Sequence, residues 1–198
     1  MDLSNFKWLN ESKLTKLDDE DAFTIYAPPN TDFFNNPDIN SRDIPQKSKN
    51  APYLYTDVEG DFVARVRVTP DFISNYDAGC IFVYQNEDVW FKICFEKSDF
   101  GTNAVVSVVT NGTSDDANGC NIDLDTIWLQ VLRVKNVFAL HYSLDGNIFD
   151  MVRLFSLPID KTVKVGLVAQ SPIGTGARHK YENFTIENRT VNDLRKGE

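Results

Sequence analysis

The sequence has 198 residues, 42% of them apolar and 25% charged, which is enough to bury one sizeable core and too little for two. Its 20 lysine and arginine residues against 29 aspartate and glutamate residues give a formal net charge of −9. Nucleic acids and anionic lipids both require a basic surface, so this charge argues against a broad nucleic-acid interface and against adhesion to an anionic membrane.

The amino-terminal residues 1–6 lack the basic and apolar regions of a secretory signal, and no run of 18 apolar residues occurs along the sequence. The three cysteines, Cys80, Cys94 and Cys120, form an odd and sparse set, which is typical of reduced thiols in a cytosol. We interpret Cys80 and Cys94, which lie inside apolar runs, as small buried hydrophobic residues. The expectation is therefore a cytoplasmic protein with no contact to a membrane.

Short segments with alternating polarity predict β-strands along most of the chain. In residues 62–68 every second side chain is apolar, and Arg65 and Arg67 occupy the opposite face. Residues 89–96 follow the same pattern, with Val89, Phe91, Ile93 and Phe95 on one face. Further segments rich in Val, Ile, Phe and Tyr are 79–85, 104–110, 128–134, 137–143, 151–155, 162–170 and 181–187.

Turn signals separate these segments. The Asp145-Gly146 pair predicts a hairpin between the strands around it, and Lys135-Asn136 links two others, with Asn136 able to adopt a positive φ. Many short strands joined by turns predict two packed antiparallel sheets in an all-β domain. Residues 35–52, with three prolines and few large apolar residues, predict a long surface loop, and residues 188–198 a polar tail that frays.

Paired carboxylates are the first catalytic feature to seek in such a fold, because glycosidases place two acids across the scissile bond. The nearest match is Glu59-Gly60-Asp61, where Ala64 stands in place of the second glutamate, and the only other pair is Asp123 and Asp125. The sequence has neither a Gly-x-Ser-x-Gly elbow nor a phosphate-binding loop. We therefore predict no catalytic residues and a protein that is not an enzyme.

Metal ligation is weakly encoded. His141 and His179 are the only histidines and lie in separate segments, so no pair with ligand spacing exists. Residues 114–123 are rich in side-chain oxygen atoms but lack the ordered spacing and bidentate glutamate of a calcium loop. We interpret them as a solvated acidic loop and predict no metal and no cofactor.

A binding face is the remaining possibility. Trp90, Lys92 and Glu96 alternate with the apolar residues of their strand and so project together from its other face. An exposed tryptophan beside a charged pair is typical of a surface that stacks on sugars or holds a peptide. The alternative is that Trp90 covers a sheet edge and that Lys92 pairs with Glu96 or another neighbour.

Eight short motifs together resemble a widespread domain family of unknown function with a concanavalin A-like lectin/glucanase sandwich. They lie at residues 6–11, 31–34, 76–79, 90–92, 113–115, 128–129, 142–146 and 166–172. The resemblance implies a two-sheet antiparallel jelly roll over residues 1–187. It adds Asp77 to the binding candidates, and we include Gln130 and His141 as further candidates on the concave face, beside Trp90, Lys92 and Glu96.

The same resemblance implies a function without catalysis. The expected protein is a non-enzymatic cytoplasmic regulator connected with the control of enolase in carbohydrate metabolism. A soluble carbohydrate-binding module is the alternative, and a glycoside hydrolase is a weaker one. The expected partner is an unidentified protein or a glycan, and neither nucleic acid nor membrane.

Overall fold

The computed structural model describes residues 3–16, 21–38, 40 and 46–198, and the regular structure of these residues is β-strand throughout. The strands are β1 (Lys7–Leu9), β2 (Leu14–Lys16), β3 (Ala22–Ala27), β4 (Phe33–Asn35), β5 (Lys47–Lys49), β6 (Tyr53–Glu59), β7 (Phe62–Thr69), β8 (Ala78–Asn86), β9 (Val89–Lys97), β10 (Asn103–Asn111), β11 (Thr113–Asn121), β12 (Ile127–Val134), β13 (Val137–Ser143), β14 (Asp150–Ser156), β15 (Thr162–Gln170) and β16 (Ala177–Glu187). Within this part of the chain, no helix has the length and apolarity to cross a bilayer.

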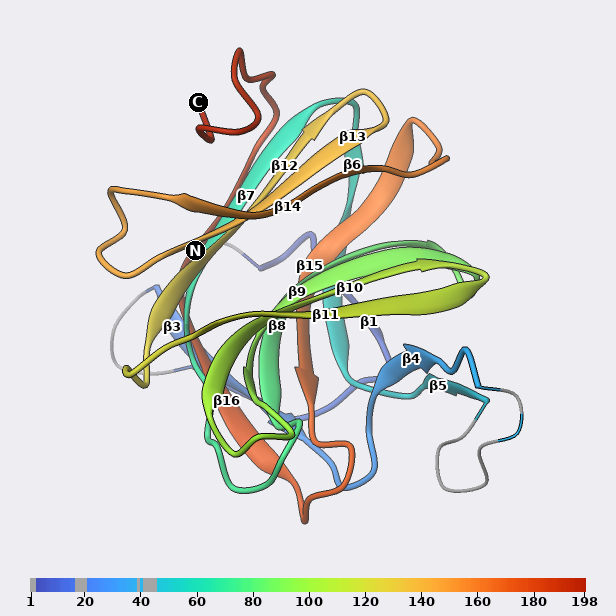
Figure 1. Ribbon diagram of the computed structural model, residues 1–198, viewed down its shortest axis with the longest axis vertical. Helices are drawn as coiled ribbons and strands as arrows, with labels where there is room; N and C mark the ends of the chain where they lie inside the picture. The colour runs from blue at the N-terminus through green and yellow to red at the C-terminus, as the bar shows by residue number, and fades with distance from the viewer. Residues whose placement is uncertain (1–2, 17–20, 39, 41–45) are drawn as a thin grey trace.

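Two seven-stranded sheets face each other (Figure 1). The first sheet has the order β1-β6-β15-β8-β9-β10-β11, and the second has the order β14-β13-β12-β7-β16-β3-β2. Neighbouring strands within both sheets pair antiparallel. The prediction of an all-β sandwich of two antiparallel sheets is confirmed.

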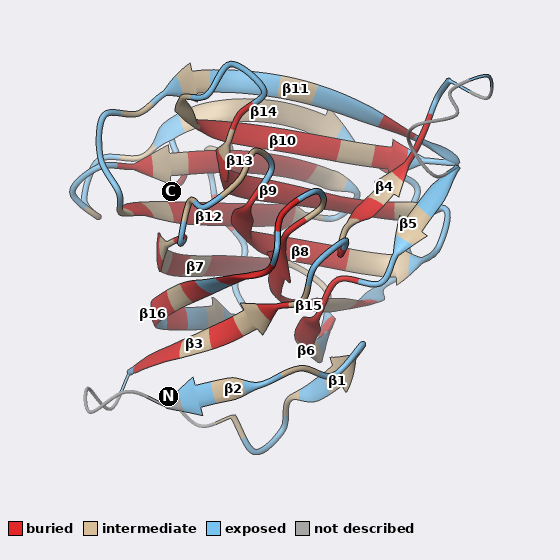
Figure 2. Cartoon of the chain, turned by 90° about the horizontal axis from the view of Figure 1, so that it is seen from below, coloured by how far each residue is buried: buried red, intermediate tan, exposed pale blue. Residues whose placement is uncertain are grey.

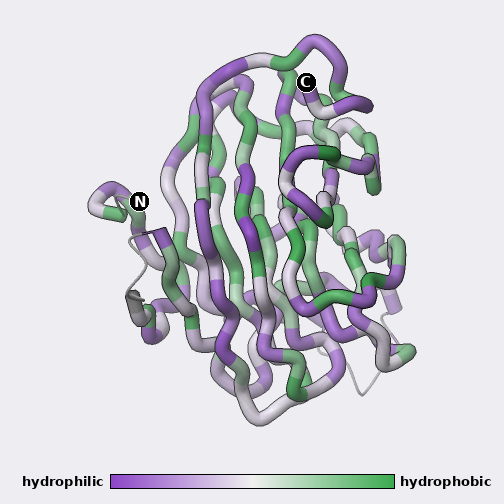
Figure 3. The backbone as a smooth tube through the Cα atoms, turned by 90° about the vertical axis from the view of Figure 1, so that its left-hand side faces the viewer, coloured by the Kyte–Doolittle hydropathy of each residue, from purple (hydrophilic) through white to green (hydrophobic). Residues whose placement is uncertain are grey.

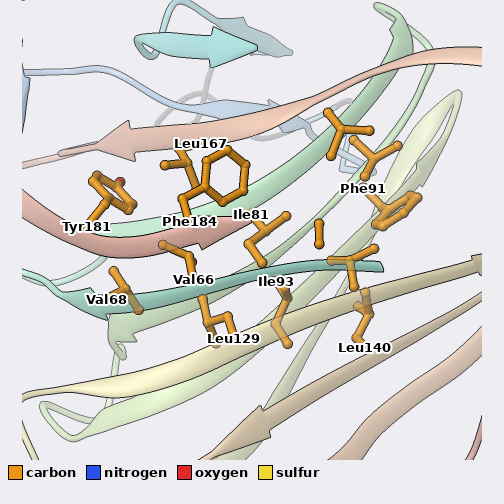
Figure 4. Packing of buried hydrophobic residues seen from close by; sticks show 14 of the residues in the cluster. Val66, Val68, Ile81, Phe91, Ile93, Leu129, Leu140, Leu167, Tyr181 and Phe184 are labelled. Carbon is orange, nitrogen blue, oxygen red and sulfur yellow. The ribbon is translucent and has the colours of Figure 1, made fainter. Parts of the chain in front are cut away.

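The core lies between the two sheets. Figure 4 shows side chains from both layers packing together, among them Val66, Ile81, Ile93 and Leu129. The period-two pattern of the strands places these residues, because successive side chains point to opposite faces. Hydrophilic and hydrophobic positions alternate visibly along the strands in Figure 3. Each fully buried side chain of this size contributes about 1.5–3 kcal/mol relative to an exposed one.

Strands β4 and β5 form a separate two-stranded sheet, which we call the β4–β5 arm. The arm lies against the first sheet, because the Asn35 side chain donates to the carbonyl oxygens of Glu87 and Gly112, at 2.9 and 3.0 Å. The predicted long loop over 35–52 is therefore corrected at both ends, where residues 33–35 and 47–49 pair as strands. Residues 39 and 41–45 of that predicted loop lie outside the described residues.

Strand β11 replaces the acidic loop predicted over 114–123. It pairs with β10 along its length and forms one edge of the first sheet, where it is exposed while β9 and β10 are buried (Figure 2). Its sequence, Thr-Ser-Asp-Asp-Ala-Asn-Gly-Cys-Asn, has no apolar alternation because neither of its faces is fully covered. Hydrogen bonding to β10 therefore makes this segment a strand, although its side chains do not alternate between polar and apolar.

Two predicted hairpins are present, one with a change. Gly146, with φ of 81°, turns the chain between β13 and β14 as the Asp145-Gly146 pair predicted. Between β12 and β13 the left-handed residue is Lys135, with φ of 56°, instead of Asn136. The backbone N–H of Lys135 donates to Asp61 at 2.8 Å and its carbonyl accepts from Arg133 at 2.8 Å, and these two bonds hold the turn.

The carboxy-terminal tail does not fray. Val191 and Leu194 pack on Val63, Leu132 and Ala139, which form an apolar strip on the outer face of the second sheet. Residues 188–198 are mostly polar, and for that reason the sequence did not indicate that Val191 and Leu194 would pack on the sheet. The tail is thus part of the folded domain.

Candidate functional site

The outer face of β9 carries the charged residues that the sequence singled out. Phe91 and Ile93 point into the core, so Lys92 and Glu96 point away from the second sheet. The prediction that these two side chains share a face is confirmed. The prediction that this face looks into solvent is wrong, because Lys92 is 2% exposed and Glu96 is 8% exposed.

Lys92 and Glu96 line a cavity of about 470 Å³ on the outer face of the first sheet, which we call the Lys92 pocket. A volume of this order is typical of pockets that bind small molecules. Side chains from six strands and three loops meet there, because the β4–β5 arm and the segments beside β8 and β15 rise around the sheet. The other lining residues are Asn30, Asp32, Phe34, Ser48, Tyr76, Val108, Asp116, Gln170, Pro172 and Ile173.

Lys92 is held by two oxygen atoms. Its Nζ lies 3.0 Å from Oδ1 of Asp32 and 2.7 Å from Oε1 of Gln170. Burial is the largest single effect on the pKa of Lys92 and lowers it, but the neighbouring acidic groups, Asp32 foremost, together outweigh burial and raise the net pKa. The ammonium group therefore keeps its charge, and Asp32 neutralises it.

Glu96 is in the opposite situation. Burial raises the pKa of Glu96 to about 8, and the attraction of Lys92 only partly opposes that effect. Its Oε2 lies 3.5 Å from Nε2 of Gln170, which is a weak contact. At neutral pH the carboxyl group is mostly protonated and can donate a hydrogen bond.

Asp116 supplies a carboxylate at the mouth of the pocket. It stands two strands away from Lys92, because Val108 of β10 faces Lys92 on one side and Asp116 on the other. Reduced hydration raises the pKa of Asp116, although the charge of Lys92 opposes this. The mouth of the pocket is therefore acidic while its single lysine is already paired.

Gln170 is positioned through its backbone by His179. The Asp71 N–H lies 3.3 Å from Nδ1 of His179 and donates to it, so the ring proton is on Nε2, which donates to the Gln170 carbonyl at 3.0 Å. Burial lowers the pKa of His179 to about 4, which keeps the ring neutral at physiological pH. His179 is therefore a structural support of the pocket.

Tyr76 stands at the rim in an unusual backbone conformation. Its φ is 69°, which is rare for a bulky residue and costs of order 1–3 kcal/mol. The Tyr76 N–H donates to the Lys97 carbonyl at 2.6 Å, and the Tyr76 carbonyl accepts from Nε2 of Gln170 at 3.3 Å. These contacts hold the backbone of Tyr76 beside the opening, where the residue is 36% exposed.

Trp90 is not an exposed stacking platform. It is 1% exposed and belongs to an aromatic cluster with Phe33, Tyr53 and Phe82, in which its ring centroid lies 6.3 Å from Phe33 and 5.4 Å from Phe82. The indole N–H donates to the carbonyl of Glu87 at 3.3 Å. The prediction of an exposed tryptophan is wrong because the β4–β5 arm covers it with Phe33.

The remaining candidates do not join the pocket lining. Asp77 is fully buried beside Tyr76, where its Oδ2 accepts from the Ser74 N–H at 2.7 Å. Gln130 and His141 lie on the outer face of the second sheet, on the other side of the core, and the carboxy-terminal tail covers them. The structure therefore brings Lys92 and Glu96 together and separates Gln130 and His141 from them.

Gln170, Asp116 and Asp32 are among the polar residues of the pocket that sequence reasoning missed as site candidates. The sequence does contain a feature that indicates Gln170. It is a polar residue in an otherwise apolar strand and shares a strand face with Val168. No feature of the sequence indicates Asp116, because polar and apolar residues do not alternate in β11. Asp32 lies in a family motif but reaches Lys92 across 60 residues of sequence, which no local pattern predicts.

The polar groups of the lining are arranged for hydrogen bonding. The lining residues include neither histidine nor cysteine, so the pocket holds no nucleophile with an adjacent imidazole base. Within the described ranges, no group of three or more His, Cys, Asp or Glu residues could hold a metal ion. What the pocket offers is hydrogen bonding: donors on Lys92, Gln170 and protonated Glu96, and acceptors on Asp32 and Asp116.

Comparison with known proteins supports the resemblance predicted from the motifs. A family model described as "Protein of unknown function (DUF1349)" matches residues 8–189. The protein named Regulation of enolase protein 1 from Saccharomyces cerevisiae is 28% identical over 187 residues, which are 93% of this chain and 90% of that protein.

Two solved structures share the architecture. The crystal structure of a functionally unknown protein from Saccharomyces cerevisiae matches with a TM-score of 0.84 and 26% identity, over 96% of this chain and 100% of that one. The carbohydrate-binding module CBM66 from Bacillus subtilis matches with a TM-score of 0.60 and 10% identity, over 93% of this chain and 96% of that one. The second likeness shows the fold alone. The predicted jelly-roll sandwich of the lectin/glucanase type is confirmed.

Proposed function

The chain belongs to the DUF1349 family, and from this premise we propose that it is a non-enzymatic cytoplasmic protein that takes part in the control of enolase. The proposal is supported by the name of the yeast relative and by the length over which the two chains align. We assign the Lys92 pocket as the ligand site through which this regulation responds to the state of carbohydrate metabolism.

The observation that carries the ligand assignment is the charge balance of the pocket. Lys92 is neutralised by Asp32, Glu96 is mostly protonated at neutral pH, and Asp116 adds a carboxylate at the mouth. An anionic ligand such as a sugar phosphate would meet this carboxylate without a free cation to bind. A neutral molecule with several hydroxyl groups would pair with both the donors and the acceptors, so we infer an unphosphorylated sugar or polyol.

A carbohydrate-binding module is the second candidate function. Tyr76 supports it, because its partly exposed ring stands at the rim beside Ile173 and offers an apolar face to a sugar ring. Under this second hypothesis the pocket binds the terminal sugar of a glycan, and the protein has no role in the control of enolase. A hydrolase is the weakest version, since it would need Glu96 and Asp116 to flank a scissile bond at about 5–10 Å.

The test combines two titrations by calorimetry, one with neutral and phosphorylated monosaccharides and one with purified enolase. We expect a neutral sugar to bind at millimolar or lower concentration, and Gln170→Leu to weaken that binding at least tenfold, because it removes a donor and an acceptor. Glu187→Gln, at an exposed position of the second sheet, is the control. Enolase should bind and its turnover should change when the chain is added.

The outcomes separate the candidates. Sugar binding without any effect on enolase supports the carbohydrate-binding module and contradicts the regulatory role. Preferential binding of sugar phosphates would refute the charge argument. Release of product from aryl glycosides, lost in Glu96→Gln, would instead establish a hydrolase.

A further inference from the structure

Two cysteines face each other directly beneath the Lys92 pocket. Cys80 of β8 and Cys94 of β9 are opposite partners in the antiparallel register, and their sulfur atoms lie 3.0 Å apart. Both residues are fully buried and both are free thiols. Opposite residues of an antiparallel pair have Cα atoms about 4.5 or 5.5 Å apart, which lies inside the range of about 4.4–6.8 Å found across disulfides.

The thiol pair is in contact with the polar network of the pocket. Lys92 and Glu96 stand two residues before and two residues after Cys94, on the same face of β9. On the other strand, the sulfur of Cys80 lies 4.0 Å from Oε1 of Gln170, the atom that accepts from Lys92. A change at the two sulfur atoms would therefore reach the side chains that we assign to the ligand.

We propose that Cys80 and Cys94 are a redox modification site, at which a hydroperoxide converts the two thiols into a reversible disulfide. The formation of this bond does not depend on the proposed function. Its consequence for ligand binding does rest on that function, because the bond would displace Gln170 and loosen its contact with Lys92.

The chemistry balances with hydrogen peroxide as the oxidant. The thiolate of Cys94 attacks one peroxide oxygen, the O–O bond breaks, and the other oxygen leaves as hydroxide and takes a proton to form water. The sulfur of Cys80 then attacks the sulfenic acid sulfur of Cys94, which forms the S–S bond and releases a second water. The two thiols lose two electrons in total, and the peroxide gains them.

Burial sets the rate of this reaction. Burial raises the pKa of Cys94, and the neighbouring Cys80 raises it further, while the charge of Lys92 opposes both. Since the thiolate is the reactive form, oxidation should be slow at neutral pH and should speed up about tenfold per pH unit in mildly alkaline buffer. Once formed, the disulfide can be reduced by exchange with a small dithiol, which in the folded protein has to reach two buried sulfur atoms.

The test uses the full chain, reduced and then treated with excess hydrogen peroxide. After quenching, the protein is unfolded and alkylated, and its thiols are counted by mass spectrometry. We expect a mass loss of about 2 Da, one remaining free thiol, and a single cross-linked peptide joining Cys80 to Cys94. Dithiothreitol should restore all three thiols.

Two variants control the result. Cys120→Ser removes the only other cysteine and should leave the cross-link intact, while Cys94→Ser should abolish it. The proposal is overturned if both Cys80 and Cys94 are still alkylated after peroxide treatment, or if the cross-link joins Cys120 or a second molecule.

A second measurement follows the pocket itself. In two-dimensional NMR spectra, the side-chain amide of Gln170 should shift on oxidation, and the shift should be absent in Cys94→Ser. If the cross-link forms but no sugar binds in either redox state, the modification site stands and the ligand assignment fails.

Discussion

Glu96 is a carboxyl group that the fold keeps away from water. Its pKa of about 8 in the folded protein stands well above the ordinary value of 4.5, because burial penalises the charged form. Between these two values the unfolded chain releases a proton that the folded chain retains. Unfolding therefore becomes easier as pH rises from 4.5 to about 8, and the contribution of Glu96 is constant above that range.

Replacing Glu96 with glutamine should remove this dependence. We expect Glu96→Gln to raise the free energy of unfolding by about 3 kcal/mol above pH 8, less than the full pKa difference implies because the pocket is partly hydrated. The gain should shrink toward zero near pH 5. Urea unfolding at several pH values measures it, with the exposed Glu187→Gln as control. A variant with the same pH profile as the unaltered protein would contradict the buried, protonated state.

For a single residue, the sequence predicts to which face of the strand its side chain points but not whether that face is buried. The alternation of β9 correctly placed Lys92 and Glu96 on one face, because strand periodicity is a local property. Whether that face is exposed to solvent depends on residues distant in sequence, such as Asp32 and Phe33, and on how they pack against it. Trp90 was assigned to solvent for the same reason, since no feature within its own strand reports the layer above it.

The β4–β5 arm is the element that turns a sheet face into a pocket. Phe33 of β4 is 1% exposed and packs on Trp90, Phe82 and Tyr53, while Phe34 beside it lines the cavity. One short strand thus closes an apolar cluster with one side chain and shapes the binding site with the next. The alternation that builds the main sheets operates here over three residues.

Phe33→Ala should detach the arm from the sheet. We expect the free energy of unfolding to fall by about 3–5 kcal/mol, because the change leaves a void against three aromatic rings. Tryptophan fluorescence should shift to longer wavelength as Trp90 meets water. Phe100→Ala, at a site that is 77% exposed, is the control and should change neither quantity. A loss no larger than that of the control would show that the arm is not docked.

Elements with a strong internal pattern were predicted almost to the residue, as β12, β13 and β15 show. Those without one were missed or misassigned. Strand β11 is polar on both faces, and β4 and β5 are too short to show a period. Such strands form because a neighbouring strand supplies hydrogen-bond partners, and the residues of the strand itself do not show where that neighbour lies.

At the level of the whole molecule, the two sheets present different outer faces. The first sheet carries the Lys92 pocket, and the second carries the apolar strip of Val63, Leu132 and Ala139 under the carboxy-terminal tail. His141 is buried there, with its Nε2 3.2 Å from the Arg195 carbonyl. The tail therefore seals the face opposite to the ligand site.

Removing residues 190–198 should expose this face. We expect the free energy of unfolding to fall by about 2 kcal/mol, from the loss of Val191 and Leu194 packing. Burial lowers the pKa of His141 more than its bonds to the tail raise it, so its pKa should rise toward the ordinary value of 6.5. NMR titration measures this, with His179 as internal reference. An unshifted His141 would mean that the tail does not shield it.

The exposed rim of β11 has a consequence for how copies of the protein meet. Its outer backbone amides and carbonyls have no partner strand in the first sheet, and such a rim can recruit another chain into a continuous ribbon. Asp115 and Asp116 place charge on that rim, and Arg153 of the other layer ties down Asp115 at 3.0 Å. The acidic residues of β11 thus place negative charge at the position where a strand of a second copy would add, and this charge opposes edge-to-edge association of copies of the chain.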